Sequence, residues 1–241
     1  MPSLRPALAL AALLFASAAA AQSPKADSRP TVAVLYFDYT GKSEELGVLR
    51  KGLAQMLISD LGAVDAVRIV ERDRLQEILA ELKLQGTAKI DPASASKVGK
   101  LLGARYMLLG GYFDLLGALR VDARLVEVET GKIVHSVGAN GTPGEFLAVE
   151  QKVAEAVSGK LATLLPVAKQ PSPEPDRQVA PARPRPSRPA KLATAVAVQY
   201  AKALDLKDQG KKQEAKAQLA EVVKAQPDFK LAALDLDRMM Q

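Results

Sequence analysis

The sequence predicts a mixed α/β protein: a β-sheet with flanking helices, followed by a proline-rich linker and a small α-helical hairpin. Three observations support this fold class. Between residues 30 and 165, short β-branched and aromatic runs alternate with longer segments of helical periodicity. Eight of the 15 prolines lie in residues 166–189, a composition that favours extended chain without a core. Beyond residue 191 the apolar spacing is helical again.

Residues 1–21 have the features of a signal peptide. One cation, Arg5, precedes an apolar run over 7–16, and the small residue Ala21 suits cleavage directly after it. The apolar run is shorter than the roughly 20 residues that a membrane span requires. An uncleaved anchor helix is the alternative. We therefore expect an exported protein with residues 22–29 as a short N-terminal extension.

The first part of the α/β domain predicts strands and helices in alternation. Residues 31–37 are almost all apolar and predict a central strand buried on both faces. Apolar residues at three- and four-residue steps predict a helix over 44–62, with Gly62 placed to end it. Three further elements follow: a strand over 67–70, a helix over 73–84, and a helix that starts with Asp91 as its N-cap and ends at Gly103.

The remainder of the domain changes from helical to extended periodicity. Residues 106–112 predict a strand, and 119–128 with 132–137 predict a hairpin. Its turn contains Gly131, a residue that readily takes the positive φ of a tight turn.

Two more features complete the predicted domain, which spans 30–165. The apolar alternation shifts phase between Leu125 and Val126, which predicts a β-bulge or a strand end covered on both faces. Residues 145–165 have the periodicity of a closing helix.

Several stretches in this domain together resemble the CsgG family, the curli-assembly group that includes HfaB-type and FlgO-type envelope proteins. They are the opening strand VAVLYFDYTG, then VERDRLQEILAELKLQ, then ASKVGKLLGARYMLLGGY, and finally VDARLVEVETGKIVHS, which is similar to the family's hairpin. The resemblance covers residues 30–165. It implies a periplasmic α/β domain.

Two departures from CsgG itself bear on the expected function. In the family that this chain resembles, CsgG itself is an outer-membrane lipoprotein that forms an oligomeric export pore by extending hairpins through the bilayer. This chain has no cysteine to carry a lipid. The predicted loops over 114–118 and 138–144 are too short for a pair of membrane strands of about 9–11 residues each. We expect the domain without lipid anchor or pore, closer to FlgO-type members or penicillin-binding-protein activators, with a pore subunit as the alternative.

Residues 191–241 resemble one tetratricopeptide repeat, a helical pair of about 34 residues. Pro227 falls at the repeat's proline position, whereas Gln199 stands where the repeat often has tryptophan. A single helical pair cannot bury its apolar face alone. We expect it to dock on the α/β domain, pair with a second copy or bind a partner. The candidates for packing or partner contact are Tyr200, Leu204, Leu219 and Val223.

The formal charge of +6 lies mostly outside the predicted α/β domain. Residues 22–165 hold 18 Lys or Arg and 18 Asp or Glu, whereas 166–241 hold 14 against 9. Nucleic-acid binding needs clustered cations on a folded face, so we expect none. In the predicted linker, 166–190, three arginines either contact an anionic envelope surface or belong to a solvated tether: Arg183, Arg185 and Arg188.

No residue pattern supports catalysis, and we predict no catalytic, cofactor or metal site. The chain has no cysteine and one histidine, His135, which excludes a thiol nucleophile and a His/Cys metal cluster. The sequence GKS at 41–43 resembles the end of a phosphate-binding loop, but Tyr36 stands where the first glycine belongs. A periplasmic hydrolase using His135 or Glu127 is the catalytic alternative. A sheet histidine and a solvated strand face are the simpler interpretations.

The charged run over 71–74, at a predicted helix start, is either an interaction patch or a set of first-turn ion pairs.

Together the features of the sequence predict a non-catalytic periplasmic protein, with outer-membrane association as an option. We expect an accessory or structural component of envelope assembly or secretion, which binds protein partners or itself. The linker would let the helical pair search for a partner.

Overall fold

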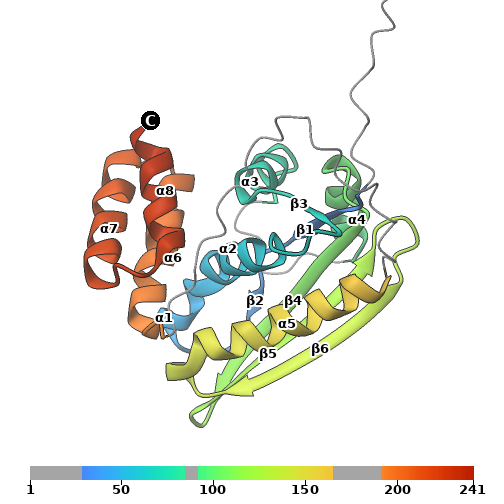
Figure 1. The fold of residues 1–241 in the computed structure, drawn as a ribbon, viewed down its shortest axis with the longest axis horizontal. Helices are drawn as coiled ribbons and strands as arrows, with labels where there is room; N and C mark the ends of the chain where they lie inside the picture. Colours follow the sequence, from blue (N-terminus) through green and yellow to red (C-terminus); the bar gives the residue numbers. More distant parts are fainter. Residues whose placement is uncertain (1–28, 85–91, 165–190) are drawn as a thin grey trace, which may run out of the picture.

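The structure, a computed structural model, describes residues 29–84, 92–164 and 191–241. In these ranges a mixed β-sheet carries helices on both faces, and three further helices pack beside it (Figure 1). The predicted mixed α/β class is confirmed. Several predictions lie outside the described residues: the signal peptide, the Asp91 cap and the linker with Arg183, Arg185 and Arg188.

The sheet has the strand order β3-β1-β4-β5-β6, with β2 pairing β4 off this path. The pairs of β1 with β3 and β4 are parallel, as is that of β2 with β4, whereas β4, β5 and β6 are antiparallel neighbours. All four residues of β1 are buried, as predicted for a central strand. The strands are β1 (Thr31–Val34), β2 (Asp38–Tyr39), β3 (Arg68–Ile69), β4 (Tyr106–Leu115), β5 (Ala118–Glu127) and β6 (Ile133–Gly141).

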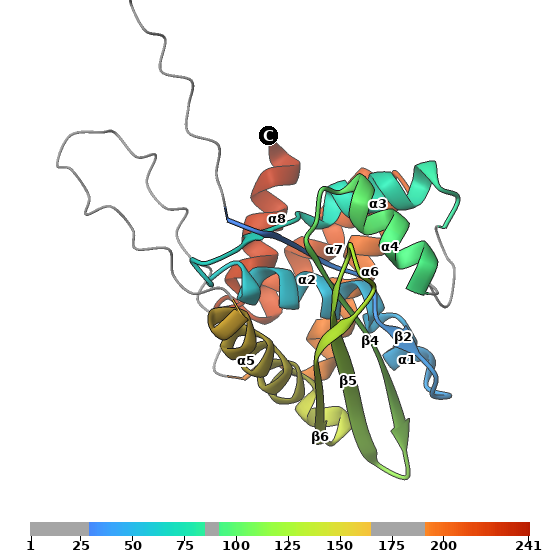
Figure 2. The same cartoon turned by 90° about the vertical axis from the view of Figure 1, so that its right-hand side faces the viewer.

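Helices cover the two faces of the sheet with separate apolar clusters. α2 and α5 lie on one face of the sheet, and α3 and α4 lie on the other (Figure 2). Their buried side chains belong to two separate apolar clusters. A capping box between Thr142 and Glu145 starts a short 3-10 helix, Pro143–Glu145, that leads into α5, and the Thr142 N–H donates to Glu145 Oε2 at 2.9 Å. The helices are α1 (Glu44–Gly47), α2 (Leu49–Leu61), α3 (Arg72–Glu81), α4 (Pro92–Leu101) and α5 (Phe146–Leu164).

The single helix predicted over 44–62 is wrong, because the chain breaks it at Val48 into α1 and α2. Ser43 caps the first piece, with its Oγ accepting from the Leu46 N–H at 3.2 Å. Gly47 has low helix propensity, and a Cβ there would lie 3.4 Å from the ring of Tyr39. Packing of α1 against Tyr39 therefore offsets α1 from α2.

The loops predicted over 114–118 and 138–144 are mostly strand, since β4 runs to Leu115 and β6 to Gly141. The β4–β5 turn is only Leu116 and Gly117, with φ of 49° and 80°, as in a type I′ hairpin turn. Because β4 and β6 both pair with β5, the two strands continue past the ends of their apolar patterns. The predicted bulge is confirmed as a register shift between Leu125 and Val126.

The C-terminal unit has three helices rather than the predicted pair. The third is a helix of 11 residues that follows Phe229, α8. Phe229 itself is buried, and its ring packs edge-on against Tyr200 with centroids 5.0 Å apart. The three helices are α6 (Thr194–Asp208), α7 (Lys212–Ala225) and α8 (Lys230–Met240).

Candidate functional site

The C-terminal helices dock on the α/β domain through the contact of α6 with α2. A Cβ placed on Gly52 of α2 would lie 3.0 Å from the Cβ of Ala201 on α6. Gly52 and Ala201 are both buried. The absent side chain at Gly52 thus lets the two helices approach closely. Three arrangements were expected for these helices: docking on the α/β domain, pairing with a second copy, or binding a partner. The structure shows the first, docking on the α/β domain.

The predicted contact residues of the C-terminal unit lie in the interior. Tyr200, Leu204 and Leu219 are at most 2% exposed, and Val223 is partly buried against the same apolar core. Their side chains therefore serve packing within the chain. Contact of these residues with a separate protein stays a prediction, and it would require the helices to move apart.

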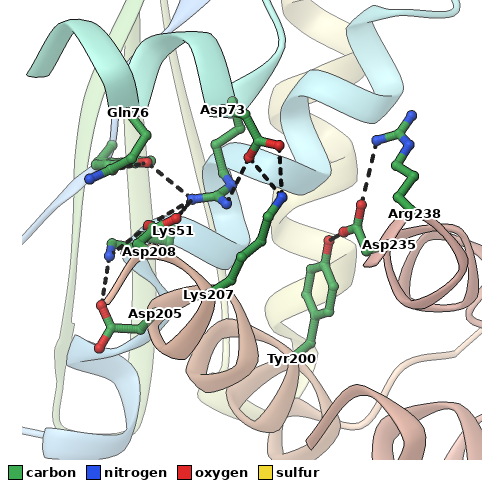
Figure 3. A network of polar contacts seen from close by, with 11 residues as sticks. Lys51, Asp73, Gln76, Tyr200, Asp205, Lys207, Asp208, Asp235 and Arg238 are labelled. Carbon is green, nitrogen blue, oxygen red and sulfur yellow. Dashed lines mark hydrogen bonds and ion pairs between the residues drawn. The ribbon is translucent and has the colours of Figure 1, made fainter. Parts of the chain in front are cut away.

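Beside this apolar contact lies a cluster of alternating charges that we call the polar seam (Figure 3). Arg72 is its most buried member, with 2% of the side chain exposed, and its Nη1 lies 2.8 Å from Oδ2 of Asp208 at the end of α6. Three cations face three carboxylates across the seam. Its members are Lys51 on α2, Arg72 and Asp73 on α3, and Asp205, Lys207 and Asp208 on α6.

Every charge of the polar seam has an opposite partner on the other part of the chain. Lys51 Nζ lies 2.6 Å from Asp205 Oδ1 and 2.8 Å from Asp208 Oδ2. Lys207 Nζ lies 2.7 Å from Asp73 Oδ2. The charged run at 71–74 is thus an interaction patch, but its partner is the chain's own α6. First-turn pairing is also present, since Arg72 Nη2 lies 3.1 Å from Asp73 Oδ1.

Tyr36 extends the polar seam into the sheet. Its hydroxyl donates to Gln76 Oε1 at 2.8 Å and accepts from Arg72 Nη1 at 3.2 Å. Burial raises the pKa of Tyr36 to about 12, although the charge of Arg72 opposes the shift. Burial alone would lower the pKa of Arg72, but Tyr36 and Asp208 outweigh it and raise that pKa. Tyr36 therefore stays a neutral donor, and Arg72 stays charged.

A second buried polar pair joins α6 to α8. The Tyr200 hydroxyl donates to Asp235 Oδ2 at 2.5 Å, and Arg238 Nη1 lies 3.5 Å from Asp235 Oδ1. Burial raises the pKa of Asp235 despite the hydrogen bond from Tyr200 and the charge of Arg238. Burial also raises the pKa of Tyr200 well above its usual value. The pair lies inside the helical unit and fixes α8 on α6.

The residues considered for catalysis have separate surroundings. Glu127 ends β5 and accepts a hydrogen bond from Thr130 Oγ1 in the following turn at 2.8 Å. His135 is partly buried on β6, opposite Leu125. Ser43 caps α1, so the GKS sequence forms a helix start. Within the described ranges, no group of three or more His, Cys, Asp or Glu side chains is placed to hold a metal ion.

The polar seam is therefore an ion-pair network that joins two parts of one chain. The sequence analysis identified its α3 side but missed Tyr36, Lys51 and all three members on α6. One signal was available, because Asp205 and Asp208 are three residues apart and share a face of a predicted helix. Among the helices that the structure describes, none is both long and apolar enough to cross a membrane.

A protein-family model matches part of the chain. Residues 14–115 match the family model for the curli production assembly/transport component CsgG. That segment includes the strands from β1 to β4 and ends before α5 and the C-terminal helices.

Individual proteins are similar at low identity. Putative adenylate cyclase 3 of Rhizobium meliloti (strain 1021) is 24% identical over 143 residues, which are 59% of this chain and 23% of that protein. The chain thus spans under a quarter of the length of that curated relative.

Three solved structures are also similar. The LpoB C-terminal domain from Salmonella enterica has a TM-score of 0.41 and 16% identity, over 47% of this chain and 83% of that one. Lipoprotein GNA1162 from Neisseria meningitidis has a TM-score of 0.40 and 14% identity, over 57% of this chain and 98% of that one. The PelC dodecamer from Paraburkholderia phytofirmans has a TM-score of 0.32 and 20% identity, over 59% of this chain and 93% of that one.

Proposed function

We propose that this chain is an exported, non-catalytic envelope protein that serves as an accessory or structural component in envelope assembly or secretion. Its action is to bind other envelope proteins or further copies of itself. The match of residues 14–115 to the CsgG model, described as a curli assembly and transport component, carries the proposal. The signal peptide predicted over 1–21 supports export to the periplasm.

The geometry supports a binding role. The polar seam is engaged in ion pairs between α2, α3 and α6. These pairs join the α/β domain to the C-terminal helices, so binding of other proteins falls to the outer surfaces of both. Nothing in the described part of the chain favours the pore subunit or the hydrolase over this role.

The proposed domain organisation follows the sequence boundaries: signal peptide 1–21, extension 22–29, α/β domain 30–165, linker 166–190 and helical unit 191–241. Because the helices dock, we assign the linker a connecting role between α5 and α6. The linker arginines remain proposed contacts with an anionic envelope surface: Arg183, Arg185 and Arg188.

Site-specific photo-crosslinking in the organism of origin tests this function. A photoreactive phenylalanine derivative would replace Phe113, which is 36% exposed on β4, or the buried Phe37 as the matched control. We expect the chain in the periplasm, cleaved after Ala21, with adducts to envelope proteins or to itself from position 113 and none from position 37. Retention of the chain in the cytoplasm, or equal adducts from both positions, would contradict the proposal.

A further inference from the structure

A cleft of about 730 Å³ opens between the sheet edge, α2 and α8. β3 is the terminal strand of the sheet on this side. Leu231 and Leu234, about one turn apart on α8, line the cleft together with Ile58 of α2. The docked C-terminal helices therefore supply one apolar wall, and the α/β domain supplies the other. Volume and location are typical of a ligand site between two parts of a protein.

The polar lining of this cleft is predominantly cationic. Arg29, Arg68 and Arg238 line it, together with the carboxylate of Glu71. Arg238 also pairs with Asp235, and Arg29 Nη1 donates to Asp65 O at 3.3 Å. All three arginines are exposed. Arg68 Nη2 also donates to Thr31 Oγ1 at 2.8 Å, which helps to hold its guanidinium beside the sheet edge. Guanidinium groups match the planar geometry of carboxylates, so the cleft favours an anionic ligand.

The backbone of β3 adds a third recognition feature. The N–H of Arg68 donates to Pro30 O at 3.0 Å, and that of Val70 donates to Val32 O at 2.9 Å. Successive residues of a strand direct their backbone groups to opposite sides. The N–H and C=O of Ile69 therefore point away from β1, toward the open edge. An open sheet edge flanked by apolar side chains is the geometry that accepts an extended peptide as an added strand.

We propose that this cleft binds an extended acidic segment of a protein partner. The segment pairs its backbone with Ile69, places carboxylates against the arginines and lays apolar side chains on Leu231 and Leu234. Main-chain hydrogen bonds supply affinity in this mode, and the charges supply orientation and a faster association rate. The inference rests on the proposed function, which requires protein partners, and adds the site and the chemistry of the segment.

A labelled peptide titration of the full exported chain tests the cleft. The probe is a fluorescein-labelled peptide of alternating glutamate and leucine, followed by fluorescence anisotropy at low ionic strength. We expect the variant Arg29→Gln/Arg68→Gln to bind the probe about tenfold more weakly, since two charges facing the ligand are lost. The control Arg74→Gln/Arg124→Gln removes the same net charge from exposed positions outside the cleft lining and should bind like the parent chain.

Four further measurements keep the proposal falsifiable. The denaturation midpoint of each variant shows whether it folds, and Leu234→Glu places a negative charge in the cleft without removing an arginine. We expect Leu234→Glu to weaken binding as well. A peptide with glutamine in place of glutamate should bind weakly. Equal binding of both arginine variants, or displacement of the probe by inorganic phosphate as readily as by unlabelled peptide, would overturn the proposal.

The two proposals fail in different ways. If the chain bound no acidic peptide while crosslinking at position 113 still captured envelope proteins, the cleft inference would be wrong and the proposed function would stand. If the chain stayed in the cytoplasm, the proposed function would be wrong whatever the peptide did.

Discussion

Arg72 of α3 and Asp208 of α6 form a buried ion pair across 136 residues of sequence, with Nη1 2.8 Å from Oδ2. Only 2% and 6% of the two side chains are exposed. A buried pair recovers its desolvation cost only when both charges are present and hydrogen-bonded. The stability of the α/β domain therefore depends on the docked helices, and the stability of the docked helices depends on the α/β domain.

Replacing one partner of this pair should be strongly destabilising. We expect Arg72→Met to lower the free energy of unfolding by about 1.5–3 kcal/mol, because Asp208 loses a charge-assisted hydrogen-bond donor and keeps only Lys51 as its cation. Urea denaturation measures the change. The control Arg74→Met removes an exposed pair with Glu77, with side chains 55% and 62% exposed, and should change stability by less than about 1 kcal/mol. Similar effects for both variants would show that the buried pair has no special role.

The close approach of α2 and α6 predicts a steric effect at Gly52. Gly52→Leu would force a side chain against Ala201, whose Cβ is only 3.0 Å from the site of the new Cβ. We expect a loss of about 1–3 kcal/mol from overpacking and faster amide hydrogen exchange in α6. The control Gly159→Leu, on α5, meets nothing within 4 Å and should be neutral or stabilising, because glycine is a poor helix former. If amide hydrogen exchange in α6 of Gly52→Leu were as slow as in the parent chain, the tight contact between α2 and α6 would be refuted.

The buried carboxyl of Asp235 should make the protein less stable as pH rises. Burial raises the pKa of Asp235 in the folded state, so the native state binds more protons than the unfolded state above about pH 4. Stability then falls as pH rises from about 4 through the folded pKa, with a slope of up to about 1.4 kcal/mol per pH unit.

Asp235→Asn keeps an oxygen to accept the Tyr200 hydroxyl but cannot ionise. We expect this variant to lack that downward slope and to be at least as stable as the parent chain near neutral pH. Urea denaturation across this pH range measures it. The control Asp237→Asn changes an exposed residue of the same helix. An unchanged slope in Asp235→Asn would contradict the assignment.

Asp73 should have the opposite pH dependence. Burial alone would raise the pKa of Asp73, but the hydrogen bond and charge of Lys207 and the charge of Arg72 lower it. Its stabilisation is therefore present above about pH 4 and is lost as pH falls through the folded pKa. Because the Asp73 side chain is 62% exposed, we expect Asp73→Asn to cost less than about 1 kcal/mol near neutral pH.

The difference between Asp73→Asn and the parent chain should vanish in acid, as measured by denaturation at both pH values. The matched control is Glu77→Gln, which removes the exposed partner of Arg74 and should have little effect at either pH. A larger loss for Asp73→Asn in acid than near neutral pH would reverse the predicted sign.

The β4–β5 turn contains a residue that its conformation disfavours. Leu116 has a φ of 49° and precedes Gly117 with a φ of 80°, where type I′ turns prefer Asn followed by Gly. We expect Leu116→Asn to stabilise the protein by about 1 kcal/mol, measured as a higher thermal midpoint. Leu115→Asn is the control, because Leu115 is exposed in regular strand and the change should lower stability. A lower midpoint for Leu116→Asn would show that Leu116 contributes contacts that offset its backbone strain.

Much of the α/β domain was predictable because its elements follow local rules. The buried opening strand, the phase shift between Leu125 and Val126 and the helical stripes of α2 and α5 each reflect periodic burial. Strand ends were not predictable in this way. β4 and β6 continue through glycine and polar residues, because pairing with β5 holds them in extended conformation after the apolar pattern ends.

The candidate site was only half predictable. The charged run at 71–74 marks one side of the polar seam, but nothing local shows that Asp208 is its counterpart. The apolar spacing of 191–241 likewise predicts helices with a face to bury. That spacing leaves open whether the covering surface is the α/β domain, a second copy or a partner.

The sequence by itself determined the fold class, the helical nature of the C-terminus and the neutrality of residues 22–165, because each depends on composition or on spacing between near neighbours. Only the tertiary structure decided where the C-terminal helices lie, that Arg72 pairs with Asp208, and that three arginines gather around the β3 edge. These features join residues far apart in the chain, and no local pattern records which distant surfaces fit each other in shape and charge.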